Sequence, residues 1–246
     1  MTSNDASHKS SVHQQIVSFW DSVAKPYHDT ETEEVNASPD ILCKELELDA
    51  LCRVLNPDLD TIEIGCGNGH NLFKLQETFT GPLTGLDISF QMIKHARSRN
   101  SDIDFIAGDI LTDLQFGHTF SQIFSVRCLI NIQPFNNQLH ALSQITALAN
   151  VGGVIALIEP TLQSLNQLNE LREVVGLEEI ELRWHNLYLD EEQFLDNLPD
   201  DLELEYIDRF SSTYYLASRI FNAIATPKGE SPDYRSAINQ AGRLLP

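Results

Sequence analysis

The sequence has few basic residues, few cysteines and no long apolar run. It contains 16 Lys and Arg against 36 Asp and Glu among 246 residues, so its net charge is −20. A surface this acidic repels phosphate backbones, which argues against nucleic acid as a partner. The 4 cysteines include no Cys-x-x-Cys pair. We therefore expect neither a disulfide framework nor a zinc site or other metal centre.

Targeting and membrane signals are also lacking. No segment approaches the roughly 18 apolar residues that a membrane-spanning helix needs. Residues 1–12 are polar and lack the apolar centre of a signal peptide. We interpret them as a flexible leader on a cytoplasmic protein that has no membrane partner. The hydrophobic share of 42% and the charged share of 21% are typical of a globular domain.

From residue 60 onward, short apolar segments alternate with amphipathic ones. We expect strands at 61–64, 83–87, 103–107, 120–126 and 154–158, with helices at 71–79, 89–99 and 137–150. This alternation predicts an α/β fold with a mostly parallel, doubly wound sheet and helices on both faces. Helices are also expected at 13–24 and at 39–55, the second opened by Ser38 as N-cap.

The last third of the chain is less regular. We expect helices at 162–175, 190–198 and 234–244, and a strand at 202–210, where apolar and acidic residues alternate. Residues 212–225 fit a strand, a helix, or a strand that runs into a helix.

A glycine loop after the first expected strand is the strongest local signal. Residues 65–69 read Gly-Cys-Gly-Asn-Gly. Glycines allow a tight turn and a close approach of a ligand to the backbone. Ligands of such sheets bind beyond the carboxyl ends of the strands. A dinucleotide-binding loop would have a third glycine at position 70, where His70 stands. Glu63, two residues before the loop, suits a cationic ligand better than a phosphate.

Two further carboxylates follow the next two expected strands. Asp87 ends the second strand, where an acidic side chain can accept hydrogen bonds from ribose hydroxyls. Asp109 follows the third strand, where it can accept from an adenine amino group. Either residue alone is more often a helix cap or turn residue. Together with Glu63, however, they place carboxylates at three strand ends, which caps do not explain.

These motifs resemble the class I S-adenosylmethionine-dependent methyltransferases of the small-molecule type, similar to methyltransferase types 11 and 12. The resemblance covers residues 19–160 and rests on 63–69, Asp87, 108–110 and 148–153. It implies a Rossmann-like core at 59–160 with six or seven strands, which binds S-adenosylmethionine and releases S-adenosylhomocysteine. It also implies an N-terminal helical lid at 13–58. Substrate-side helices, the last strand or strands and a tail would follow at 161–246.

The resemblance further assigns residues to the cofactor. Glu63 and the glycine loop would hold the methionine amine, and Asp87 the ribose. For Arg127, an approach to the methionine end and a salt-bridging role are equally good interpretations. The full expected set is Tyr27, Glu63, Gly65, Cys66, Gly67, Asn68, Asp87, Ile88, Asp109, Ile110 and Arg127. In this set Tyr27 would close over the methionine part, and Ile88 and Ile110 would contact the adenine.

The acceptor side is less defined. Residues 125–131 lack the Asn-Pro-Pro-Tyr signature of methyltransferases that act on nucleobases or protein amides. His185 is the candidate general base or substrate ligand, with a packed imidazole as the alternative. Tyr188, Tyr214, Tyr215 and Arg219 are candidate substrate-binding residues, although the tyrosine pair also fits core packing.

One stretch of the same region is strongly acidic. Residues 170–208 hold 14 acidic and 2 basic side chains, a net of −12. Such a stretch either attracts a cationic substrate or forms a solvated face.

The sequence therefore predicts an enzyme that transfers a methyl group to an oxygen or nitrogen of a small molecule. In-line displacement depends mainly on holding the nucleophile and the methyl group close and aligned. A general base, for which His185 is the candidate, assists a protonated nucleophile. The alternatives are a protein or RNA methyltransferase, a non-catalytic cofactor-binding subunit that activates a partner, and another reaction on the same cofactor. The acceptor and the oligomeric state, including a homo-oligomer, stay open.

Overall fold

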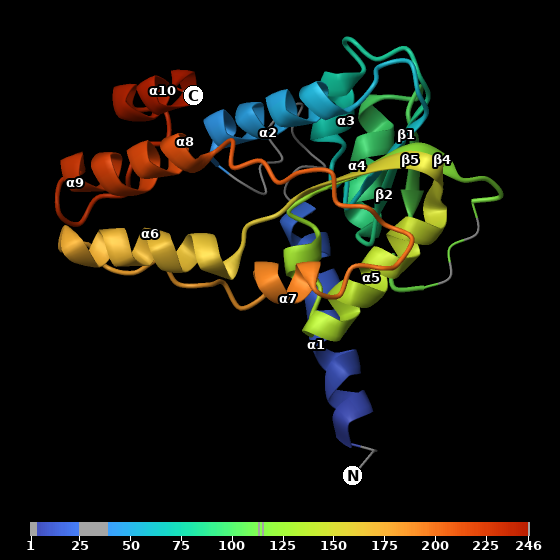
Figure 1. Cartoon of the computed structure of the whole chain (residues 1–246), viewed down its shortest axis with the longest axis horizontal. Coiled ribbons are helices and arrows are strands. Elements are labelled where there is room, and N and C mark those ends of the chain that lie inside the picture. The colour runs from blue at the N-terminus through green and yellow to red at the C-terminus, as the bar shows by residue number, and fades with distance from the viewer. Residues whose placement is uncertain (1–3, 25–38, 113, 115, 246) are drawn as a thin grey trace.

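A five-stranded parallel sheet forms the centre of the computed structural model, which describes residues 4–24, 39–112, 114 and 116–245 (Figure 1). The strands are β1 (Thr61–Ile64), β2 (Leu83–Asp87), β3 (Asp104–Ala107), β4 (Phe120–Val126) and β5 (Ala149–Ile158). Their order in the sheet is β3-β2-β1-β4-β5, and every neighbouring pair is parallel. The order reverses between β1 and β4, which is where open α/β sheets bind ligands.

Apolar side chains on both faces of the sheet pack against the helices that cover it. On one face, Ile62 and Ile123 belong to a cluster with the inner side of α5 (Phe135–Leu148). On the other, Phe124 belongs to a cluster with α2 (Ile41–Val54), α3 (His70–Leu75) and α4 (Phe90–Arg99). All four β1 residues are buried. The predicted doubly wound, Rossmann-like arrangement is therefore confirmed.

The far edge of the sheet differs from the prediction. The described residues form five strands, not six or seven, and none of them pairs with the free edge of β5. Residues 202–210, expected as a strand, do not form one, and residues 203–209 are exposed. The apolar residues of this alternating segment are exposed together with the acidic ones at 203, 205 and 208, so it has no buried face.

The N-terminal helices begin at other residues than expected. Helix α1 (Asn4–Ala24) starts within the segment that we interpreted as a flexible leader. The N-cap of α2 is Asp40, whose carboxylate accepts a hydrogen bond from the Cys43 amide at 3.1 Å. The expected cap, Ser38, lies outside the described residues. An Asp side chain satisfies a free amide of the first turn as well as Ser does.

The C-terminal helices form a lobe beside the sheet (Figure 1). They are α6 (Leu162–Val174), α8 (Ser212–Leu216), a π-helical segment (Ala217–Phe221), α9 (Asn222–Ala225) and α10 (Ala237–Leu244), whereas the short α7 (Glu191–Leu195) lies by α5, and its Phe194 belongs to the core cluster of the sheet. Residues 212–225 are thus helical throughout, one of the three alternatives. Helix α10 packs on α8 and α2, which fastens the lobe to the N-terminal part of the chain. No helix in the described ranges is long and apolar enough to cross a membrane.

Candidate active site

A cavity of about 1410 Å³ opens beyond the carboxyl ends of the strands. It collects most of the residues that the sequence predicted for the site. These are Glu63, Gly65, Cys66, Gly67, Asn68, Asp87, Ile88, Asp109, Ile110, Arg127, His185, Tyr188, Tyr215 and Arg219. Tyr214 is not among the lining residues, and Tyr27 lies outside the described residues. In the described chain, no group of three or more His, Cys, Asp or Glu could hold a metal ion.

The glycine loop has the backbone shape that only glycine adopts easily. Gly65 and Gly67 have φ values of +76° and +53°. A Cβ on Gly65 would lie 2.5 Å from the Cys128 sulfur, so the loop packs closely there. No described atom lies within 4 Å of the corresponding position on Gly67. The backbone at Gly67 is therefore not covered by other described atoms on this side, which leaves room for a ligand.

Glu63 is a buried carboxyl with one unused oxygen. It is 2% exposed, and its Oε1 accepts a hydrogen bond from the Asn71 side chain at 2.7 Å. Its Oε2 is buried and has no hydrogen-bond partner among the described residues. Burial raises the pKa of Glu63 to about 8, against the opposing effect of the Asn71 hydrogen bond. A buried oxygen without a partner is costly, and a cationic ligand group would satisfy it.

Asp87 joins the glycine loop to the start of α4. Its Oδ2 accepts from the Gly67 amide at 2.7 Å and its Oδ1 from the Ser89 amide at 2.8 Å. Burial raises its pKa to about 6, opposed by these two backbone hydrogen bonds. Each carboxylate oxygen accepts more than one hydrogen bond. The turn role expected of a lone Asp and an interaction with ribose hydroxyls are therefore compatible.

Asp109 is held by a residue of α1 that sequence reasoning assigned no role. Its Oδ1 accepts from the Leu111 amide at 2.9 Å, and its Oδ2 lies 2.9 Å from the His13 Nε2. His13, Ile16 and Trp20 line the cavity. Their spacing of three and four residues, visible in the sequence, places them on one side of a helix. Helix α1 thus covers the Asp109 side of the cavity.

Arg127 forms the salt bridge considered for it and also lines the cavity. It follows β4 with a φ of +53°, lines the cavity, and forms a salt bridge with Glu47 of α2 at 3.0 Å. Burial raises the pKa of Glu47, while the Arg127 charge lowers it. Lys44, one turn earlier on α2, also lines the cavity, and burial followed by the Arg127 charge lowers its pKa to about 8. Both α2 residues were missed, although their i, i+3 spacing places them on one side of the helix.

Asp40 connects the C-terminal lobe to α2. It accepts a hydrogen bond from the Tyr214 hydroxyl and forms an ion pair with Arg219 at 2.7 Å. The Arg219 guanidinium lies 5.1 Å from the centre of the Tyr215 ring and 4.9 Å from that of Tyr234. Tyr214 is 1% exposed. Its predicted substrate-binding role is corrected to core packing, because its ring is buried and its hydroxyl is used by Asp40.

His185 lies where α1 meets the cavity. It is 4% exposed, and its ring stacks on Phe19 with 4.4 Å between ring centres. Its Nδ1 is buried and has no hydrogen-bond partner among the described residues. Burial, followed by the charge of Arg183, lowers its pKa. The imidazole is therefore neutral near pH 7. The segment is fixed by a 2.6 Å hydrogen bond from the Leu187 amide to the Ile130 carbonyl.

Glu159, just after β5, is a further buried carboxyl that sequence reasoning missed. It accepts hydrogen bonds from the amides of Cys128 and Leu129 at 2.9 Å and of Ile130 at 3.3 Å. Burial raises its pKa to about 7, opposed by these bonds. Its place after an apolar strand and before Pro160 was the available signal. Its role is to cap the turn (Leu129–Asn131) that follows β4.

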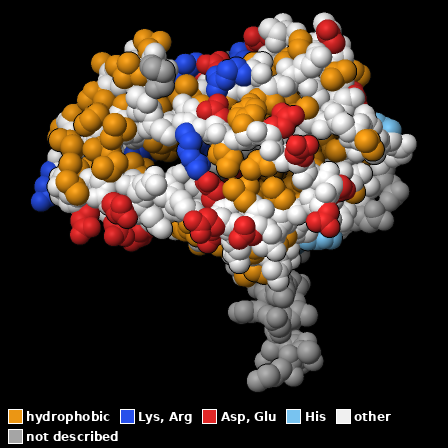
Figure 2. Space-filling model, viewed as in Figure 1, with side chains coloured by type: hydrophobic (Ala, Val, Ile, Leu, Met, Phe, Trp, Pro, Cys, Tyr) orange, Lys and Arg blue, Asp and Glu red, His pale blue; other side chains and the backbone are white. Residues whose placement is uncertain are grey.

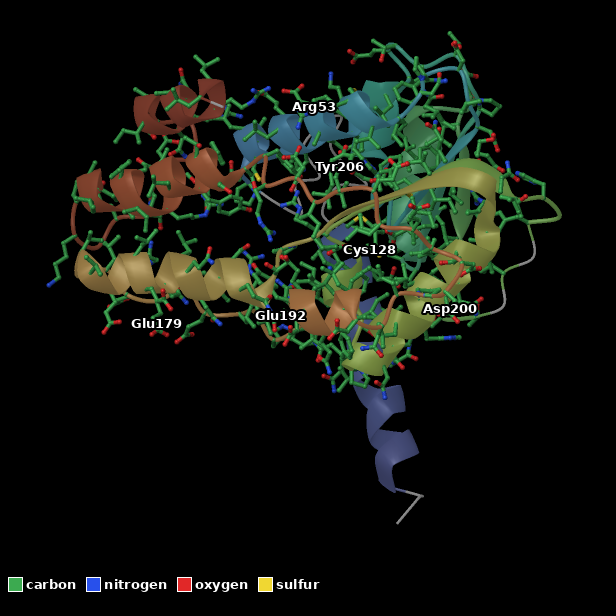
Figure 3. The ribbon with its side chains drawn as sticks, in the orientation of Figure 1. Arg53, Cys128, Glu179, Glu192, Asp200 and Tyr206 are labelled. Atoms are coloured by element: carbon green, nitrogen blue, oxygen red, sulfur yellow. The ribbon has the colours of Figure 1, made fainter. Side chains whose placement is uncertain are left out.

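The acidic stretch at 170–208 faces mostly outward. Glu179, Glu192 and Asp200 are exposed, and Figure 3 shows Glu179 at the edge of the molecule below α6. Arg209 pairs with Glu191 at 2.6 Å on this surface. Six other acidic residues of the stretch line the cavity: Glu181, Glu191, Asp201, Glu203, Glu205 and Asp208. The stretch therefore contributes both to the solvated face and to the cavity.

Comparison with known proteins agrees with the fold. Residues 62–153 match a family model described as a methyltransferase domain. This part of the chain is therefore similar to methyltransferase domains. The match covers β1 to the start of β5, including the glycine loop, Asp87 and Asp109. The predicted resemblance is thereby confirmed for the core of the chain.

Individual relatives are distant. The phosphoethanolamine N-methyltransferase of Triticum aestivum is 29% identical over 83 residues, which are 32% of this chain and 16% of that protein. A chain of the complex between the Haloferax volcanii methyltransferase activator Trm112 and a candidate methyltransferase matches 74% of this chain and 75% of its own, with 20% identity and a TM-score of 0.52. The DhpI–SAH complex matches 62% and 71%, with 20% identity and a TM-score of 0.50. These structures show the fold.

Proposed function

We propose that the protein transfers the methyl group of S-adenosylmethionine to an oxygen or nitrogen of a small molecule and releases S-adenosylhomocysteine. One observation carries this proposal. The unused Glu63 oxygen, the open side of Gly67 and the Asp87 carboxylate line one cavity of a methyltransferase domain. They offer a partner for an ammonium group, room against the backbone and acceptors for hydroxyls. The amino acid and ribose parts of the cofactor need these three features.

The remaining polar groups complete the fit. Asp109 and Ile110 would frame the adenine, with Ile88 on its other side. Lys44 lies within electrostatic reach of Glu63, and Arg127 lines the same cavity, so that their charges suit the methionine carboxylate. When bound, the cofactor supplies an electrophilic methyl group. The protein then has to align the acceptor with that group, since alignment accounts for most of the rate of such a displacement.

His185 is the proposed general base. It lines the cavity as a neutral imidazole, the form that accepts a proton, and its buried Nδ1 has no hydrogen-bond partner among the described residues. A positioned base contributes roughly 10²–10⁴-fold to the rate. We expect His185→Gln to lower kcat within this range and to leave S-adenosylhomocysteine binding unchanged.

The cofactor is the first point to test. Isothermal calorimetry should show micromolar binding of S-adenosylhomocysteine to the wild type and none to Asp87→Ala. Asp102→Ala, which removes an exposed carboxylate, serves as the matched control and should bind like the wild type. NAD is the control ligand. Tighter binding of NAD, or no binding of S-adenosylhomocysteine to the wild type, would refute the proposed function.

A further inference from the structure

The cavity continues past the cofactor residues as an apolar groove. Its walls come from three elements: the edge strand β5 at residues 154–158, one side of α6, and the extended segment at 202–207. The walls include Leu165, Leu168, Leu171, Leu202, Leu204 and Tyr206. The whole cavity of about 1410 Å³ exceeds the roughly 300–1,000 Å³ of ordinary small-molecule sites. It therefore has room for more than a cofactor and a compact acceptor.

The apolar walls of the groove are open to solvent. Leu171, Leu204 and Tyr206 are 47%, 51% and 56% exposed. None of the residues of α6, all of them described, is buried. Figure 2 shows a hollow in this face, with hydrophobic side chains on both sides and Lys or Arg beside it. Contiguous exposed apolar surface of this kind marks a binding site.

The inner end of the groove meets the proposed methyl-transfer site. The Arg127 amide donates a hydrogen bond to the Ile158 carbonyl at 2.8 Å, which joins the end of β5 to the site. Tyr188 lines the cavity within the electrostatic reach of both Arg127 and Arg219. The cavity is thus polar and charged at its inner end, and along its length it has apolar walls with acidic side chains at their border.

We propose that the methyl acceptor is an amphiphile with one apolar chain. This inference rests on the proposed function. The accepting oxygen or nitrogen lies at the inner end, near His185 and Tyr188, and the chain lies between β5, α6 and residues 202–207. A second copy of the protein is disfavoured as the occupant. Each copy has a net charge of −20, and Glu203, Glu205 and Asp208 border the groove, so two copies repel each other.

Chain length is the measurable property that follows. Each methylene that moves from water into an apolar wall strengthens binding about fourfold. The probes are the straight-chain 1-alkanols from butanol to octanol, measured by calorimetry on protein saturated with S-adenosylhomocysteine. Over the four added methylenes, we expect the dissociation constant to fall by about 250-fold.

Two pairs of variants test whether the groove itself is responsible. Leu171→Asp and Leu204→Asp place a charge in its walls and should weaken octanol binding at least tenfold. Val174→Asp and Leu244→Asp change residues that are 83% and 82% exposed and do not line the cavity. These control variants should bind octanol as the wild type does, and all four variants should keep their affinity for S-adenosylhomocysteine.

Several results would overturn the inference. Alkanol affinity that is independent of chain length would do so, as would equal losses in groove and control variants. If the wild type binds no alkanol and forms a dimer that Leu171→Asp and Leu204→Asp dissociate, a second copy of the protein is the occupant of the groove. In these cases intact S-adenosylhomocysteine binding leaves the proposed function standing. If the wild type binds no S-adenosylhomocysteine, the proposed function fails, and the inference fails with it.

Discussion

Cofactor binding should release a proton from Glu63. The pKa of this carboxyl is raised to about 8, chiefly by burial, so it is mostly protonated at neutral pH without a ligand. The methionine ammonium would lie against its unused Oε2 and favour the ionised form. Binding of S-adenosylhomocysteine therefore selects a carboxylate that the unliganded protein holds only as a minor species.

The size of the effect follows from the pKa. At pH 6, two units below about 8, ionising the carboxyl costs about 2.7 kcal/mol. At pH 8 about half of the molecules are already ionised. We expect the affinity for S-adenosylhomocysteine to rise about 50-fold from pH 6 to pH 8, with about one proton released per ligand near pH 6.5.

Calorimetry in buffers of different ionisation enthalpy measures both quantities. Glu63→Gln should bind S-adenosylhomocysteine more weakly at pH 8 and should lose most of the pH dependence, because the amide does not ionise. Methylthioadenosine, which lacks the amino acid part, is the control and should bind wild type and Glu63→Gln alike. An affinity of the wild type for S-adenosylhomocysteine that is equal at pH 6 and pH 8 would refute this reasoning.

Three further predictions concern stability and the lid. The folded-state pKa of Glu63 lies above its ordinary value of 4.5, so the folded chain holds the extra proton, and the unliganded protein should become more resistant to urea as pH falls from 8 toward 5. His13→Ala removes a partly exposed contact with the Asp109 carboxyl and should speed S-adenosylhomocysteine dissociation in stopped-flow by no more than about fivefold. Asp40→Ala leaves Arg219 without its carboxylate and should cost about 3–5 kcal/mol in urea unfolding, while a loss below 1 kcal/mol would contradict the buried pair.

Local patterns in the sequence were enough to predict the core. The strand at 61–64, the glycines after it and the carboxylates at 63, 87 and 109 are each specified within a few residues, and the structure brings them to one cavity. The same holds for α6, expected at 162–175 and found at Leu162–Val174. Hydrophobic periodicity and turn residues predict such elements, because the neighbours of each strand and helix follow from their alternation along the chain.

The parts that failed depend on contacts between distant segments. His13 meets Asp109, and Arg127 meets Glu47, across 96 and 80 residues of chain. A local sequence pattern does not report contacts between residues so far apart in the chain. Residues 202–210 show the opposite failure, since their alternation predicted a strand that has no partner in the described sheet. Alternating apolar and polar residues indicate that a segment could bury one face as a strand. The segment becomes a strand only where a neighbouring strand pairs with it.

The free edge of β5 has a consequence for handling the protein. An unpaired strand edge is a template for pairing with another chain, and charged residues near it oppose such association. Here the carboxylates of residues 203–208 and the net charge of −20 supply that protection. Protonation near the pI of about 4.6, or screening by concentrated salt, removes it. We expect turbidity to develop first under those conditions, and the protein to remain clear and monodisperse in dilute buffer near pH 8.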